Sequence, residues 1–135
     1  MIVQTFEFSI AAGAASTNVM PSSFNPVPAD GFLDIFALLD GAIVGLTAPP
    51  KVEIIIGGTQ NSTPVNISSI TGSPYNTGAA NSFQDPSVCP VVRRLPIRQG
   101  TNSQLNVSGG TGATATGRFR VFFYTAAEAA AGAGA

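Results

Sequence analysis

The sequence predicts an all-β protein: a single antiparallel β-sandwich of about eight strands, jelly-roll-like, with extended terminal segments. Several short stretches alternate apolar and polar residues with the two-residue period of a half-buried strand. The 135 residues include 15 Gly and 10 Pro, which suit many turns, and no segment has the spacing of a long amphipathic helix. An immunoglobulin-like sandwich is the alternative, although that fold usually buries a Trp and this chain has none.

The first half of the chain contains four segments with strand character. Residues 1–10 alternate, with Phe6 and Phe8 on one face and Glu7 on the other. A short extended piece is expected at 17–20. Residues 31–41 predict a strand bounded by glycines, and 42–46 either continue it or pair with it. The faces of this strand are Leu33, Ile35 and Ala37 against Phe32, Asp34, Phe36 and Leu38.

The second half predicts the remaining strands, at 51–58, 62–70, 91–97, 103–109 and 118–125. A hairpin loop is expected at Gly57–Thr63 and a flexible Gly/Thr hairpin loop at 109–117. The last strand has an apolar face and a second face formed by Arg118, Arg120, Phe122 and Tyr124. Residues 71–87 are a long connection rich in turn formers, which is typical of a functional loop or a disordered segment.

Two parts of unequal size are expected: one β-sandwich domain over residues 1–125 and an Ala/Gly-rich tail over 126–135. The tail has a helix-like composition, but ten residues with two glycines are too few for a stable isolated helix. We therefore expect a neighbouring protein to order the tail.

The composition excludes several classes of function. Charged residues make up only 10% of the chain, against about 25% in typical soluble domains, and such surfaces tend to associate. The net charge of −1 argues against nucleic acid as a partner. Residues 1–17 lack the basic region of a signal peptide, and Asp34 and Asp40 interrupt the longest apolar run. We expect synthesis in the cytoplasm without export, and no membrane partner.

The residue types of most catalytic and metal sites are missing. The chain has no His, and its single cysteine, Cys89, predicts a small buried apolar residue. We therefore expect no enzymatic activity, no cofactor, and no catalytic, cofactor-binding or metal-binding residues. Asp34 is the least expected carboxylate because its neighbours are apolar; an ion pair with an arginine or an edge position would explain it.

Five of the six cations are arginines of the last third of the chain, and five of the seven acids lie within residues 1–53. One interpretation is intramolecular, with C-terminal strands pairing beside N-terminal ones and matching their charges. Another is an interface with an acidic partner, since the guanidinium fork bridges carboxylates well. A nucleic-acid-facing surface is a third. The candidate interface residues are Arg93, Arg94, Arg98, Arg118, Arg120, Tyr75 and Phe83 of the long loop, and Glu128 of the tail.

Residues 93–125, RRLPIRQGTNSQLNVSGGTGATATGRFRVFFYT, have an order of elements that resembles small virion proteins. An LPI strand, a turn, an LNV strand, a Gly/Thr loop and an aromatic closing strand look like the C-terminal half of single jelly-roll bacteriophage capsid cement or decoration proteins. The resemblance implies a non-enzymatic structural protein of the virion, a homo-oligomer with a trimer favoured, that binds the major capsid protein or other virion subunits. No residue role is carried over from it.

Two other functions fit the same features. One is a single jelly-roll major capsid protein, which length does not distinguish from a cement protein. The other is a receptor- or carbohydrate-binding spike or fibre module, for which Tyr75 and Phe83 are the exposed aromatic candidates.

Overall fold

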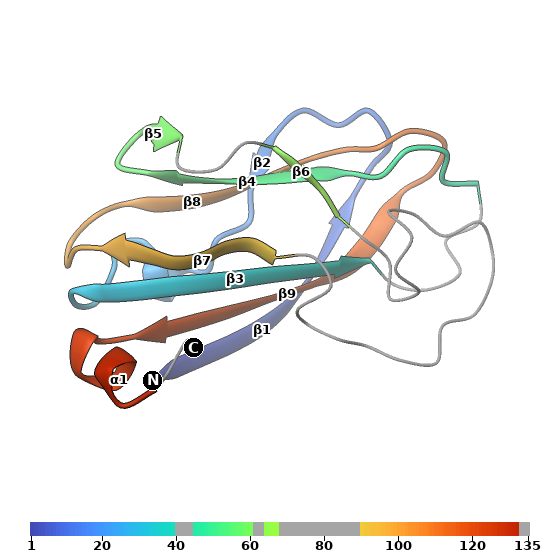
Figure 1. Cartoon of the computed structure of the whole chain (residues 1–135). Helices are drawn as coiled ribbons and strands as arrows, with labels where there is room; N and C mark the ends of the chain where they lie inside the picture. The colour runs from blue at the N-terminus through green and yellow to red at the C-terminus, as the bar shows by residue number, and fades with distance from the viewer. Residues whose placement is uncertain (40–44, 61–63, 68–89, 133–135) are drawn as a thin grey trace.

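The computed structural model describes residues 1–39, 45–60, 64–67 and 90–132. They form two antiparallel β-sheets packed face to face, so the predicted all-β sandwich is confirmed (Figure 1). Sheet A has the order β1-β9-β3-β7, made of Ile2–Ile10, Ala115–Tyr124, Gly31–Leu39 and Pro90–Ile97. Sheet B has the order β2-β8-β4-β5, made of Thr17–Asn18, Ser103–Ser108, Lys51–Ile56 and Thr59–Gln60. In sheet B, β6 (Val65–Asn66) also pairs with β4.

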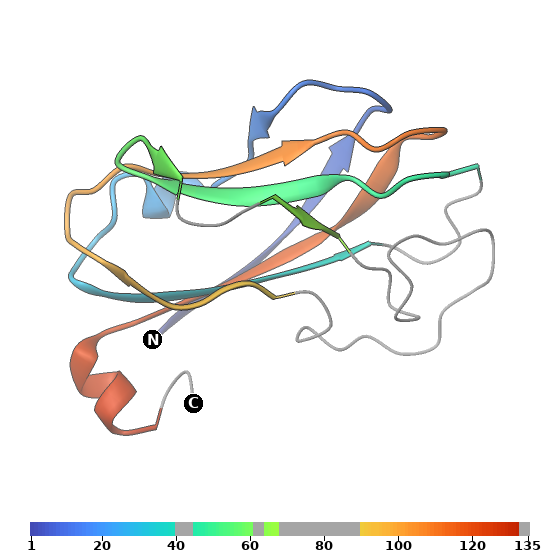
Figure 2. The same cartoon turned by 45° about the horizontal axis from the view of Figure 1, so that its top comes forward.

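The strands pair in a nested order. β1 pairs with β9, β2 with β8, β3 with β7, and β4 with both β5 and β6, always antiparallel. Because β8 occupies one edge of β4 over its whole length, β5 and β6 lie on the other edge, at opposite ends. Pairing in this order places β1, β3, β7 and β9 in one layer and the remaining strands in the other (Figure 2).

The core lies between the two sheets. It is built from the apolar face of each strand, as the alternation predicts. Sheet A contributes Leu33, Ile35, Phe119, Val121 and Phe123, and sheet B contributes Val52, Ile54, Leu105 and Val107. The Phe119 ring lies 4.7 Å from that of Phe8 and 5.4 Å from that of Phe6, centre to centre. Through these ring contacts, the edge strand β1 packs against the core residues of β9.

The central strand β3 is buried on both faces. Leu33, Ile35 and Ala37 face the core, and the outward-facing Asp34, Phe36 and Leu38 are buried as well. A strand that is flanked by β9 and β7 and covered on both sides requires a nearly continuous apolar run, which the sequence FLDIFALL provides.

The Gly/Thr segment between β8 and β9 differs from the predicted hairpin loop. β8 belongs to sheet B and β9 to sheet A, so the segment crosses between the sheets. Its backbone also bonds to two other connections: the Gly109 N–H donates to the Ala14 carbonyl, and the Thr47 N–H donates to the Thr111 carbonyl. A Cβ atom on Gly110 would lie 2.2 Å from the Ala48 oxygen. The glycines therefore serve close backbone packing at this end of the sandwich.

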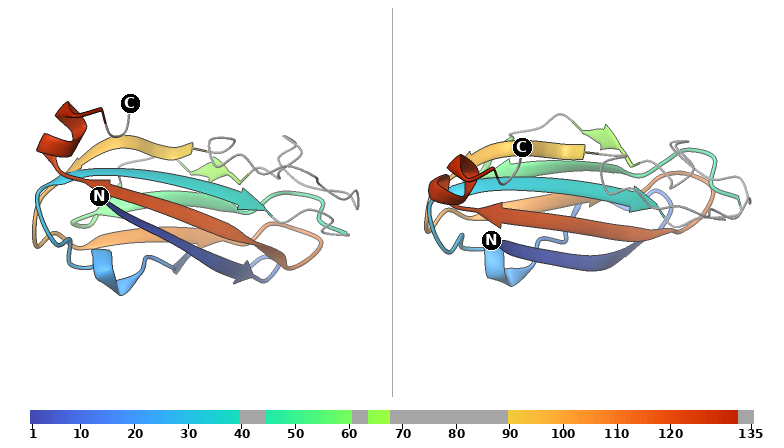
Figure 3. Two further views of the ribbon diagram at one scale, coloured as in Figure 1. Left: turned by 90° about the horizontal axis from the view of Figure 1, so that it is seen from below. Right: turned by 60° about the horizontal axis from the view of Figure 1, so that its bottom comes forward.

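Two short helices complete the described chain. η1 (Ser22–Phe24) buries Phe24 in the core, where its ring lies 6.3 Å from that of Phe123, centre to centre. α1 (Ala126–Ala130) follows β9 directly, so this part of the tail is helical rather than extended. Figure 3 shows α1 at the end of sheet A where β1 begins. Thr125 and Glu128 form a capping box that satisfies the first turn, which explains how so short a helix forms within the chain.

Some predictions concern residues outside the described ranges. They are Cys89, the long connection 71–87, most of the segment 42–46, and the ends of the strand expected at 62–70. The hairpin loop expected at Gly57–Thr63 is a two-residue turn, because Ile56 pairs with Thr59 directly across Gly57 and Gly58.

Gly117 offers a test of the packing between β9 and its neighbours. A Cβ atom at this position would lie 2.1 Å from the Leu38 oxygen and 2.8 Å from the Phe8 ring. We expect Gly117→Ala to lower the free energy of unfolding by about 1–3 kcal/mol, measured by denaturant titration. The neighbouring half-buried Thr116 is the control; a Thr116→Ala variant as destabilised as Gly117→Ala would contradict the steric explanation.

Candidate protein interface

Four of the five candidate arginines gather on the outer face of sheet A. Arg118 and Arg120 lie on β9 in register with Leu38 and Phe36 of β3, opposite the core-facing residues. Arg93 and Arg94 lie on β7, with guanidinium groups over two rings of the same face. We call this surface the arginine–aromatic face and define it by Arg93, Arg94, Arg118, Arg120, Phe32, Phe36, Phe122 and Tyr124.

A β-bulge turns Arg93 and Arg94 toward this face. Leu33 pairs with Leu95 and Ile35 with Val92, so two β7 residues stand opposite the single residue Asp34. Arg94 adopts a φ of 51°, in the left-handed region that non-glycine residues rarely occupy. Its N–H donates a 2.6 Å hydrogen bond to Oδ1 of Asp34. The carboxylate thus supplies an acceptor where the bulge interrupts the ladder.

Asp34 therefore has a different setting from the predicted one. It lies on the central strand β3 rather than at an edge, and it is only 4% exposed. Within the described ranges its carboxylate forms no ion pair with an arginine side chain; its donors are the Arg94 backbone and the Tyr124 hydroxyl, at 3.1 Å. The prediction failed because a bulge in the neighbouring strand makes a backbone N–H available, and an acceptor on the central strand can use it.

Tyr124 is fully buried beside this carboxylate. Burial raises the pKa of its phenol above the ordinary value, and the negative charge of Asp34 and the hydrogen bond to it raise the pKa further. The two nearby arginines oppose the shift. The neutral phenol is therefore the form that the folded protein prefers.

Arginine and aromatic side chains contact each other across the face. The guanidinium carbon of Arg94 lies 5.6 Å from the centre of the Phe32 ring, and that of Arg93 lies 6.0 Å from the centre of Phe36. The rings also pair between β3 and β9, Phe32 with Tyr124 at 5.6 Å and Phe36 with Phe122 at 5.9 Å. Stacking of this kind fixes the orientation of a guanidinium group, and its N–H groups can still donate hydrogen bonds to a carboxylate.

Arg118 and Arg120 lie between β1 and β3 and are half-buried. Arg118 stands opposite Glu7 in the β1–β9 ladder, and the Nε of Arg120 donates to the Thr5 hydroxyl at 3.3 Å. The N- and C-terminal strands do pair, as the intramolecular interpretation requires. The ion pair between two described residues, however, joins the Met1 ammonium to Glu128 and not one of these arginines to an N-terminal strand.

Arg98 and Glu128 occupy separate positions. Arg98 is exposed just after β7 and lines a shallow depression with Asp30, Phe32 and Ala126. Glu128 accepts a hydrogen bond from the Thr125 N–H and forms an ion pair with the Met1 ammonium. The ammonium first, and the Thr125 N–H second, lower the pKa of the Glu128 carboxyl.

Tyr75 and Phe83 lie outside the described residues. The aromatic residues that the structure does place beside the arginines, among them Phe32 and Phe36, were not among the candidates. The sequence carried a signal for Phe122 and Tyr124, which alternate with the arginines of the last strand, but none for Phe32 and Phe36.

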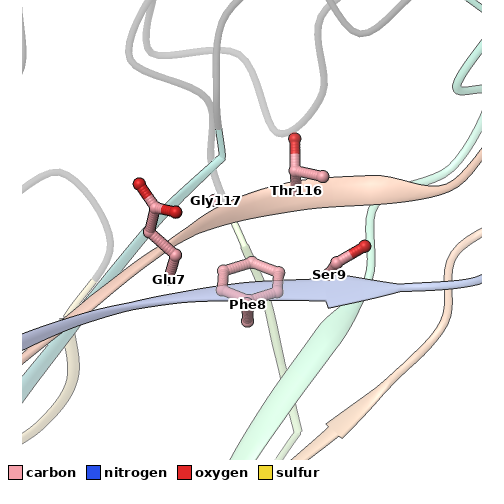
Figure 4. Close-up of a pocket in the computed structure, with 5 residues that line it drawn as sticks. All are labelled: Glu7, Phe8, Ser9, Thr116 and Gly117. Atoms are coloured by element: carbon pink, nitrogen blue, oxygen red, sulfur yellow. The ribbon is translucent and has the colours of Figure 1, made fainter.

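A second depression lies where β1 and β9 pair, at the edge of the same sheet. It is lined by Glu7, Phe8, Ser9, Thr116 and Gly117 (Figure 4). These residues offer one carboxylate and two hydroxyls around a glycine. Among residues 1–39, 45–60, 64–67 and 90–132, no three His, Cys, Asp or Glu side chains converge as metal ligands. In the same residues, no helix is long and apolar enough to cross a membrane.

The Asp34 hydrogen bonds can be tested by removing the acceptor. Asp34→Ala removes the acceptor of the hydrogen bonds from the Arg94 N–H and the buried Tyr124 hydroxyl. We expect the free energy of unfolding to fall by about 1–3 kcal/mol. Asp34→Asn keeps an oxygen and should lose less. Urea titration measures both, and an Asp34→Ala protein as stable as the wild type would refute the bulge-supporting role.

The Tyr124 pKa predicts a loss of stability at high pH. The folded-state pKa is raised, so the stabilisation is fully present below the unfolded-state value of about 10 and is lost as the pH rises through the higher folded value. In Tyr75→Phe, Tyr124 is the only tyrosine, and its tyrosinate absorbance should appear at higher pH in the folded than in the urea-unfolded protein. Identical titration curves in the two states would contradict a raised pKa.

Comparison with known proteins gives no match. No family model matches the chain, and neither does any curated protein or solved structure.

Proposed function

We propose that this protein is a non-enzymatic structural protein of a virion, a cement or decoration protein that binds and stabilises neighbouring capsid subunits through the arginine–aromatic face. The observation that carries the proposal is the composition of this face. Arginines and aromatic rings are the residues enriched at the centres of protein interfaces. Here Arg93 and Arg94 stack on phenylalanines.

The charge of the face suggests the chemistry of the partner. Four arginines accompany two carboxylates, Asp34 and Glu7, and Asp34 is buried. Counted over the described residues, the face is therefore positive although the chain as a whole carries a net charge of −1. An acidic surface on a capsid subunit is the complementary partner, and arginine forks would hold its carboxylates in place.

The strand order supports the more specific fold, a jelly roll. Nested antiparallel pairs, from β1 with β9 inward to β4 with β5, are the arrangement produced when one long hairpin wraps into two sheets. The capsid assignment itself rests on the resemblance of residues 93–125 to single jelly-roll virion proteins. The virion is then its location, and the major capsid protein or other virion subunits are its partners, with a trimer favoured.

The proposal is tested by redecorating virus particles. Particles of the virus that encodes the chain are stripped of it by chaotrope, and the purified protein is added back. We expect wild-type protein to rebind and Arg118→Gln/Arg120→Gln to bind at least about tenfold more weakly, since each interface arginine can contribute more than about 1 kcal/mol. Co-sedimentation on a density gradient measures the bound fraction.

Lys51→Gln is the matched control, because Lys51 is an exposed cation on sheet B. It should rebind like the wild type. The capsid assignment fails if purified particles do not contain the chain. The assignment of the face fails if the double-arginine variant and the lysine variant rebind equally well.

A further inference from the structure

The two edge strands of sheet A differ in their protection against further pairing. β7 carries two bulges, the exposed cations Arg93 and Arg94, and Pro96 within the strand. Bulges, charges and proline are the features by which natural sheets block addition of another strand. The β7 edge is therefore closed to a regular ladder.

β1 has neither bulge nor proline, and it has one charge. It is nine residues long, pairs with β9 in unbroken register, contains no proline and carries the single charge of Glu7. No backbone hydrogen bond joins Ile2–Ile10 to any described residue outside β9. Its first part also exposes large apolar side chains: Met1 is 57% exposed, Ile2 43% and Val3 52%.

The edges of sheet B do not offer a similar template. In the described chain, β2 at one edge and β5 and β6 at the other are each two residues long. Very short edge strands are themselves a form of protection. The outer edge of β1 is thus the long unprotected edge of the described sandwich.

We propose that the β1 edge binds a second copy of this chain, forming an antiparallel β1–β1 ladder across a two-fold axis. A register centred on Phe6 overlays all nine residues and keeps the core-facing side chains of both copies on the same side of the joined sheet. In this register Glu7 meets Thr5 of the second copy, so no like charges face each other.

The same register covers the exposed apolar residues. Ile2 stands opposite Ile10 of the second copy, and Val3 opposite Ser9. The two sheets then form one continuous sheet of eight strands, with main-chain hydrogen bonds along the edge at which no other described strand pairs. Because the contact is isologous, it closes as a dimer.

This proposal rests on the edge of sheet A and not on its outer face, so the binding role of that face does not depend on it. It gives a dimer where the resemblance to cement proteins favours a trimer. Light scattering after size exclusion at high protein concentration measures the mass of the purified full chain. We expect twice the chain mass. A monomer or a trimer would overturn the proposal.

A charge exchange tests the register. Val3→Lys/Ser9→Lys places lysines opposite each other twice across the axis. We expect the dissociation constant of this dimer to be roughly tenfold higher than that of the wild type. Val3→Lys/Ser9→Glu places opposite charges at the same two positions and should restore the dimer. Both residues are exposed and stand opposite the uncharged Phe122 and Thr116 within the chain.

Thermal unfolding followed by circular dichroism controls for the fold, and both variants should melt as β proteins. Gln104→Lys, an exposed residue of β8 away from the edge, controls for added charge and should remain dimeric. Equal masses for the two double variants would overturn the proposed register and, with it, the self-pairing.

Discussion

The buried carboxylate of Asp34 constrains the whole outer half of sheet A. A charged group that is 4% exposed must be hydrogen-bonded, and its donors come from strands on both sides of β3. The Arg94 N–H approaches from β7 and the Tyr124 hydroxyl from β9. One oxygen atom thus fixes the bulge, the left-handed backbone of Arg94 and the position of the Tyr124 ring.

The arginine–aromatic face follows from that arrangement. The bulge gives Asp34 two opposing residues instead of one, and both direct their guanidinium groups over phenylalanine rings of β3. An uninterrupted ladder would have sent one of the two side chains to the opposite face, because neighbouring residues of a strand alternate. Two cations can therefore stack on adjacent rings of one sheet without either entering the core.

Much of the fold could be predicted because alternation reports which side of a strand is buried. This signal separated the apolar face of β9 from the face that carries Arg118 and Arg120, and Phe119 and Val121 of the apolar face are buried as expected. Alternation does not report which strands are neighbours. The Gly/Thr segment before β9 was therefore assigned to a hairpin, although it crosses between sheets and packs its glycines against two other connections.

The sequence predicted which cations belong to the candidate surface, but not the contacts that they make there. Arginine clustering is visible in the sequence, but the contacts of Arg93 and Arg94 depend on a bulge in β7, and a bulge has no signature in the residues RRLP. The aromatic partners were missed because Phe32 and Phe36 belong to a strand that is apolar on both faces. Such a strand gives no pattern that distinguishes core rings from rings of the outer face.

The nested pairing of the strands has a consequence for how the chain folds. The innermost ladder, β4 with β5 across Gly57 and Gly58, joins residues that are close in sequence. Each ladder further out closes a longer loop, up to β1 with β9, which brings together nearly the two ends of the described chain. Loop-closure entropy opposes the outer ladders until the inner ones have formed, which favours an order of assembly from the β4–β5 turn outward. Contacts this distant in sequence slow folding, and the β1–β9 ladder closes the longest loop of the described ladders.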